Sequence, residues 1–114
     1  MEDLNLKDQK KAIAREAGIF LKQEFGFPAK SVNVMMENTM VLICAENFLC
    51  LAEQKMGFDK QDADLVNQMY VKIFDCSKEF FIDRINQITG RNVISSQIGI
   101  NFETKSFLMT LFLL

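Results

Sequence analysis

Residues 62–90, DADLVNQMYVKIFDCSKEFFIDRINQITG, decide the fold, because their apolar side chains recur at the spacing of an amphipathic helix. Asp59 precedes this stretch as a helix cap, and the acidic first turn suits the positive end of the helix dipole. Thr89-Gly90 ends the pattern, so we predict one long helix from Lys60 to Thr89. Its apolar stripe comprises Leu65, Val66, Met69, Tyr70, Ile73, Phe80, Phe81, Ile85 and Ile88, widened by Phe74 and Cys76.

This helix is too long for the strands that its neighbours can form. Thirty residues span about 45 Å at ~1.5 Å per residue. A strand of about eight residues spans only ~27 Å at ~3.4 Å per residue. The helix must therefore overhang its sheet, bend, or break near its start. An overhang would leave Leu65, Val66 and Met69 without a partner inside one chain.

Two pairs of apolar stretches flank the long helix and predict strands. The first pair, residues 31–37 and 40–45, is separated by Asn38-Thr39, which favours a hairpin. The second pair, residues 92–101 and 106–113, is joined by a short polar turn. In the third strand we expect Ile94, Ile98 and Ile100 to share one face and Val93 to take the other.

Helical spacing also predicts an N-terminal helix over residues 6–24, capped by Asp3 or Asn5, and a short helix over residues 51–55 that Gly57 stops. The order of elements is then helix, strand, strand, short helix, long helix, strand, strand. This order predicts an α+β fold with a single domain over residues 1–114. We expect a two-layer sandwich, a four-stranded antiparallel sheet with the long helix and the N-terminal helix on one face.

The second and fourth predicted strands are apolar on both faces, whereas a half-exposed strand alternates apolar and polar residues. Exposed apolar area of this kind often marks an interface. We therefore predict a homodimer, through either the sheet or the long helix. The alternative is that the short helix and the N-terminal arm cover the back of the sheet. The candidate interface residues are Val41, Ile43, Leu65, Val66, Met69, Leu108 and Phe112.

Composition excludes several classes of function. Thirteen Lys and Arg against fifteen Asp and Glu give a net charge of -2, which argues against nucleic-acid binding. The longest apolar runs, 40–45 and 107–113, are far shorter than the roughly 20 residues of a membrane span. The N-terminus does not resemble a signal peptide, so we expect a cytoplasmic protein that does not insert into membranes.

Histidine is absent, which removes the usual general base at neutral pH and the commonest metal ligand. The three cysteines, Cys44, Cys50 and Cys76, have no metal-binding spacing, and we expect them to be small buried apolar residues in a reducing compartment. No phosphate-binding glycine loop occurs. We therefore predict no catalytic residue, no cofactor and no metal.

Four local strings, in this order and spacing, resemble a bacterial family named MpsC, over about residues 8–114. They are FGFP at 25–28, NTMV at 38–41, LCLAE at 49–53 and ITGRNV at 88–93. The sequence departs from the family at Cys50-Leu51, where Thr-Pro is usual, and lacks a second glycine near Phe27. The resemblance implies an association with a Na⁺-translocating, membrane-potential-generating system, without an established catalytic residue. The polar residues at family-like positions are Glu53, Arg84 and Arg91.

These observations favour a non-enzymatic accessory or regulatory protein that acts by contact, with a subunit of a membrane transport complex as its expected partner. The alternative is a sensor that binds a small molecule in an apolar pocket between the long helix and the sheet. Phe74, Phe80, Phe81 and Phe112 would line that pocket. That the protein is an enzyme is the third and least favoured hypothesis.

Overall fold

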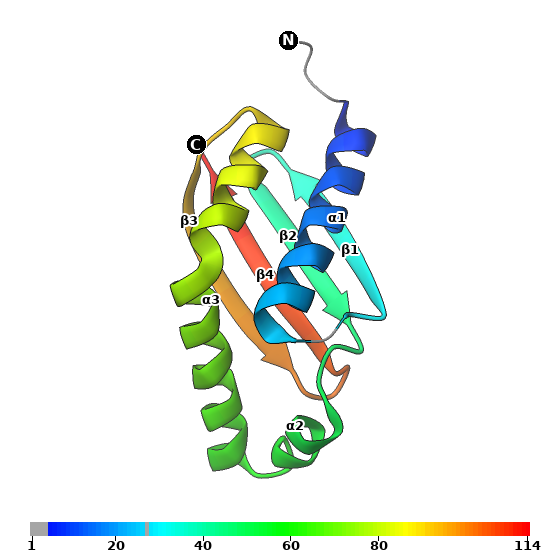
Figure 1. Cartoon of the computed structure of the whole chain (residues 1–114), viewed down its shortest axis with the longest axis vertical. Helices are drawn as coiled ribbons and strands as arrows, with labels where there is room; N and C mark the ends of the chain where they lie inside the picture. The colour runs from blue at the N-terminus through cyan, green and yellow to red at the C-terminus, as the bar shows by residue number, and fades with distance from the viewer. Residues whose placement is uncertain (1–4, 27) are drawn as a thin grey trace.

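The computed structural model describes residues 5–26 and 28–114 and shows the predicted two layers (Figure 1). The elements are α1 (Leu6–Phe25), β1 (Ser31–Glu37), β2 (Met40–Glu46), α2 (Leu51–Met56), α3 (Lys60–Thr89), β3 (Val93–Asn101) and β4 (Ser106–Leu113). Both α1 and α3 lie on one face of the antiparallel sheet, which confirms the predicted fold class.

The two long helices begin and end at the predicted signals. Asn5 caps α1, its side-chain oxygen accepting the N–H of Asp8 at 2.9 Å, and Gly26 ends it with a φ of 93°. Asp59 caps α3 through the N–H groups of Gln61 and Asp62, and Gly90 ends it with a φ of 70°. A left-handed φ is accessible to glycine without steric cost, so both stops are local. Asp3, the other predicted cap, and Phe27 lie outside the described residues.

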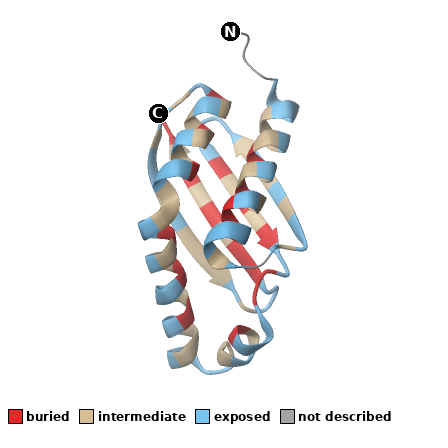
Figure 2. Ribbon diagram, in the orientation of Figure 1, coloured by how far each residue is buried: buried red, intermediate tan, exposed pale blue. Residues whose placement is uncertain are grey.

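The sheet has the order β1-β2-β4-β3. The hairpin turn at Asn38-Thr39 pairs Met36 with Val41 and Val34 with Ile43, so these side chains share the face that the helices cover. On β4 the covered face carries Phe107, Met109, Leu111 and Leu113, all buried. The core therefore lies between these strands and the two long helices, and Figure 2 shows it as the buried band between the layers.

The predicted alternation of β3 is wrong at its first residues. A register shift between Val93 and Ser95 lets Val93 pair with Leu113 and pack on the core, while Ile94 turns out and is exposed. A bulge inserts one residue into a strand and so reverses the side on which the residues before it point. Ile98 and Ile100 keep the predicted face, opposite Met109 and Phe107.

Of the three outcomes predicted for the long helix, the structure has the overhang. The N-terminal end of α3 extends beyond the sheet, and α2 folds back against it (Figure 1). Val66 and Tyr70 are buried there, whereas Leu65 and Met69 are exposed. Gly57 ends α2 as predicted, with a right-handed φ of -65°. Its missing side chain makes room for the Phe102 ring, which a Cβ would meet.

A buried polar pair fastens α2 to α3. The Tyr70 hydroxyl donates to Glu53 Oε1 at 2.7 Å, and the same oxygen accepts the N–H of Cys50 at 3.2 Å. Around Tyr70 lie the rings of Phe25 and Phe107, with centroids 4.8 and 5.2 Å away. This aromatic cluster joins the end of α1, the middle of α3 and the start of β4. Burial, and then the hydrogen bond and negative charge of Glu53, raise the pKa of Tyr70 far above its ordinary value.

Tyr70 should therefore resist ionisation in the folded protein. Because it is the single tyrosine of the chain, its ultraviolet absorbance reports only this site. We expect no tyrosinate signal at the ordinary pKa of about 10, and a signal only when the protein unfolds. Since the unfolded chain loses this proton first, the free energy of unfolding should be independent of this group below about pH 10 and fall above it.

The Tyr70→Phe variant provides the control for this titration. It should lose the alkaline drop in stability that Tyr70 causes. It should also be about 1–2 kcal/mol less stable at neutral pH, since Glu53 loses a buried donor. Urea unfolding at neutral and alkaline pH measures both effects. A tyrosine that titrates near pH 10 in the folded protein would show that the pair is open to solvent.

Candidate interaction surfaces

The face of the sheet opposite the helices carries an apolar strip. Cross-strand pairing places Cys44 beside Leu108 and Met40 beside Phe112, while Leu42 lies between Met35 and Thr110. These side chains are half-buried or exposed, and Met35 is 61% exposed. Within the described residues no helix packs on this face (Figure 1). The strip is therefore an apolar surface that one copy of the described chain leaves open.

Polar side chains border this strip on both edge strands. Pairing places Asn33 beside Cys44 and Glu37 beside Met40 on the β1 side, and Ser95 and Gln97 flank Phe112 and Thr110 on the β3 side. An apolar centre with a polar rim is the usual anatomy of a protein–protein interface. We call this surface, defined by Met35, Met40, Leu42, Cys44, Leu108 and Phe112, the open sheet face.

The sequence predicted the open sheet face on β4 but the wrong side of β2. Leu108 and Phe112 lie on it, whereas Val41 and Ile43 are fully buried against the helices. Both faces of β2 are apolar, so its own pattern could not decide between them. The two-residue hairpin could have done so, because it pairs Val41 and Ile43 with the inward side of β1.

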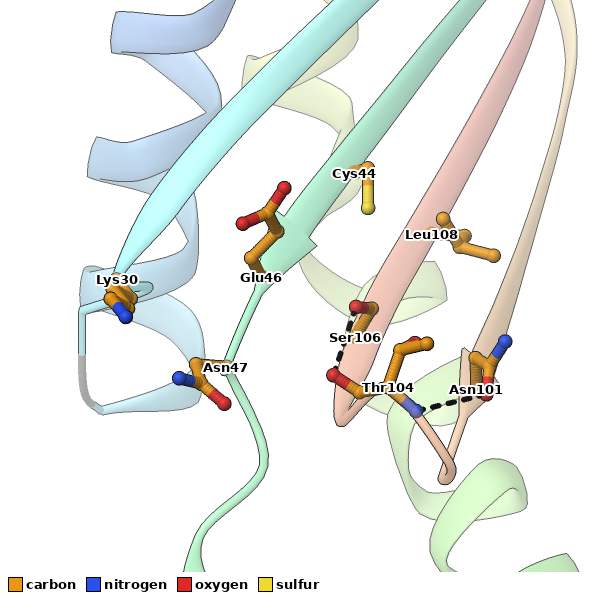
Figure 3. A pocket seen from close by; sticks show the side chains of 8 residues that line it. All are labelled: Lys30, Cys44, Glu46, Asn47, Asn101, Thr104, Ser106 and Leu108. Atoms are coloured by element: carbon orange, nitrogen blue, oxygen red, sulfur yellow. Dashed lines mark hydrogen bonds between the residues drawn. The ribbon is translucent and has the colours of Figure 1, made fainter.

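A hollow of about 550 Å³ lies at one end of the open sheet face. Figure 3 shows Lys30, Glu46 and Asn47 on one side of it and Asn101, Thr104 and Ser106 on the other, with Cys44 and Leu108 on the strands between them. Several of its polar groups are already used, since Glu46 accepts from Ser31 and Asn33, and Asn101 Oδ1 accepts the N–H of Thr104. The hollow shares Cys44 and Leu108 with the apolar strip and is part of the same surface.

A second exposed apolar stripe runs along α3. Leu65, Met69, Cys76 and Phe80 are all exposed and follow one another at spacings of four, seven and four residues, which places them on one side of the helix. Val66, predicted as part of this surface, is 2% exposed and belongs to the core. Helical periodicity placed Phe80 on the same apolar stripe as Phe81, but Phe80 is 75% exposed. Phe80 and Phe81 are adjacent and equally apolar, so the sequence held no signal for which of them faces outward.

The proposed ligand pocket does not exist in the form expected from the sequence. Phe74 and Phe81 are buried and pack against the Phe20 ring, with centroids 5.9 and 4.7 Å away. Phe80 points to solvent, and Phe112 lies on the opposite face of the sheet. The cleft beside Phe80 and Phe81 has a volume of only about 40 Å³, whereas ligand pockets usually have roughly 300–1,000 Å³.

The three polar candidates make contacts within the fold. Glu53 holds Tyr70, as described above. Arg84 donates to Glu16 of α1 at 3.0 Å and so connects the two long helices. Arg91 donates to the carbonyl oxygens of Leu114 and Asn38, which ties the turn after α3 to the β1–β2 hairpin and the end of β4.

The cysteines are free, as predicted, but the expectation that all are buried is wrong. Cys44 is half-buried, and Cys50 and Cys76 are exposed. In the described part of the chain, no cluster of three or more His, Cys, Asp or Glu side chains could hold a metal ion. Across residues 5–26 and 28–114, each helix is too short or too polar to cross a membrane.

Comparison with known proteins identifies the family. Searches of curated proteins and of solved structures each found no match. The profile of one family, described as "Na+-translocating membrane potential-generating system (MpsC)", matches residues 6–114, nearly the whole chain. The resemblance carried by the four sequence strings is thereby confirmed, and the chain belongs to the MpsC family.

Proposed function

We propose that this chain is a non-enzymatic accessory or regulatory protein that acts by protein–protein contact in the cytoplasm, as a homodimer formed through the open sheet face. The single observation that supports this most is the pattern of β2 and β4, which are apolar on both faces although the helices cover only one. Burial of apolar area stabilises by about 25 cal/mol per Å², so a second copy on this face would be favoured.

The size of the open sheet face fits a dimer. Four strands about 4.8 Å apart and about 27 Å long present roughly 500 Å² in projection. With its side-chain relief and the adjoining hollow, the face approaches the roughly 800 Å² per partner of a stable interface. Two copies related by a two-fold axis would bring the same strip against itself, which is the geometry of most homodimers.

The family supports a role beside a membrane transport system. Its description names a Na⁺-translocating system that generates a membrane potential. Glu53, Arg84 and Arg91 are engaged in holding the fold together, which favours contact over catalysis as the activity of this chain. We propose that the dimer is an accessory component of such a system.

Light scattering tests the dimer and its interface. Wild-type protein should have twice the chain mass of 13.1 kDa, and Leu108→Asp should be monomeric, because it places a charge in the centre of the strip. The matched control is Leu65→Asp, which adds the same charge on the exposed stripe of α3 and should stay dimeric. Circular dichroism verifies that both variants fold. A wild-type monomer at high concentration, or loss of the dimer only in Leu65→Asp, would contradict the proposed interface.

The link to the Na⁺ system is tested in cells of the native host. A strain that lacks this gene should lose the Na⁺-dependent part of its membrane potential, measured with a voltage-sensitive dye in the presence of a protonophore. Wild type should restore it, and Leu108→Asp should not. An unchanged Na⁺-dependent potential in the deletion strain would remove this role and leave the dimer unaffected.

A further inference from the structure

The outer stripe of α3, defined by Leu65, Met69, Cys76 and Phe80, differs from scattered surface apolar residues in its regular spacing. Single exposed apolar residues are normal in folded proteins, but here 54% of Leu65, 45% of Met69 and 75% of Phe80 are exposed along one line. The line is about 22 Å long at ~1.5 Å per residue, or roughly four helical turns. It has the form of the contact seam between two helices.

Part of α1 continues this surface. Ile19, 41% exposed, lines the shallow cleft between α1 and α3 together with Phe80. Below the end of α1, the N-terminal end of α3 extends past the sheet, so its outer side is free to lie along another helix (Figure 1). The apolar surface is thus open along its whole length.

The charges around the stripe define the chemistry of its partner. Asp62 lies three residues before Leu65, and Asp83 lies three residues after Phe80, so one carboxylate stands at each end. Glu79 is next to Phe80, and Glu24 lines the same cleft on α1. Of the neighbouring cations, Arg84 is bound to Glu16 and Lys78 to Asp75, while the exposed Lys72 lies on the line itself, between Met69 and Cys76. An apolar line among carboxylates is complementary to a helix with apolar and basic side chains.

Phe80 adds a second reason to expect cations. An exposed aromatic ring attracts a Lys or Arg side chain through its negative face, and nearby carboxylates strengthen that preference. Anionic lipids, by contrast, would be repelled by the same carboxylates. A second copy of the chain could offer its own stripe, but it would bring Asp62, Glu79 and Asp83 against the same carboxylates, so a basic helix is the better complement.

We propose that the outer stripe of α3, with Ile19 of α1, binds a basic amphipathic helix of a different protein. The partner lays its apolar residues along Leu65, Met69 and Phe80 and directs its Lys and Arg side chains to the flanking carboxylates. Cytoplasmic segments next to membrane spans are rich in Lys and Arg, so a membrane subunit is a natural source of such a helix. The inference rests on the proposed contact function and names its partner.

Binding of two synthetic peptides tests this inference. One peptide of about 18 residues, roughly 27 Å as a helix, carries Leu at helical spacing with Lys elsewhere, and the second replaces every Lys by Glu. Fluorescence anisotropy with the full chain should show the Leu–Lys peptide binding at least about tenfold more tightly. Added salt should weaken this binding, because the contacts between charges are exposed.

Substitutions test whether the Leu–Lys peptide binds on the outer stripe of α3. Phe80→Ser should weaken binding of the Leu–Lys peptide about tenfold, as loss of a central aromatic contact does. The control is Phe58→Ser, since Phe58 is 92% exposed in the connection between α2 and α3, outside the stripe. The double change Glu79→Gln and Asp83→Asn should weaken the Leu–Lys peptide and not the Leu–Glu peptide.

The outcomes separate this inference from the proposed dimer. Leu108→Asp alters the opposite face of the molecule and should bind the Leu–Lys peptide as wild type does, whether or not it is monomeric. Equal affinity for both peptides, or the same loss in Phe58→Ser as in Phe80→Ser, would overturn the inference. Circular dichroism of each variant excludes unfolding as the cause, and Phe80 is exposed enough for its replacement to leave the core intact.

Discussion

The structure depends on a mismatch of lengths between α3 and the sheet that it covers. A helix of 30 residues crosses strands of seven to nine residues, so the N-terminal end of the helix has no sheet beneath it. The chain meets this constraint by folding α2 against the overhang and burying Val66 and Tyr70 there. The Tyr70–Glu53 hydrogen bond fastens this arrangement, and the protein has a long shape of 49 × 24 × 24 Å.

The short helix α2 covers only part of the overhanging end of α3, which leaves apolar side chains of α3 exposed. A six-residue helix can shield only one side of the α3 overhang, so Leu65 and Met69 remain in solvent. On the other layer, two helices cover one side of a sheet whose central strands are apolar on both sides. The open sheet face and the outer stripe of α3 therefore lie on opposite sides of the molecule, and each can be occupied without displacing the other.

The polar residues support the same picture of a scaffold for contacts. Arg84 connects α1 to α3, and Arg91 connects the α3–β3 turn to the hairpin and to the end of β4. Arg84 thus holds the two helices of one layer together, and Arg91 ties the end of α3 to the sheet, which keeps both surfaces in a fixed relation. A protein with two such faces can join a second copy and a further partner at once, as the proposed accessory role requires.

The sequence by itself determined the elements and their layers. Helix boundaries depend on local signals, and so the sequence was enough to predict them. These signals are the apolar periodicity, the caps at Asn5 and Asp59, and the stops at Gly26 and Gly90. Only the tertiary structure decided that a bulge turns Ile94 outward and that Phe80 faces solvent while Phe81 is buried. Each of these depends on the register of one element against another, and neighbouring apolar residues look alike until that register is set.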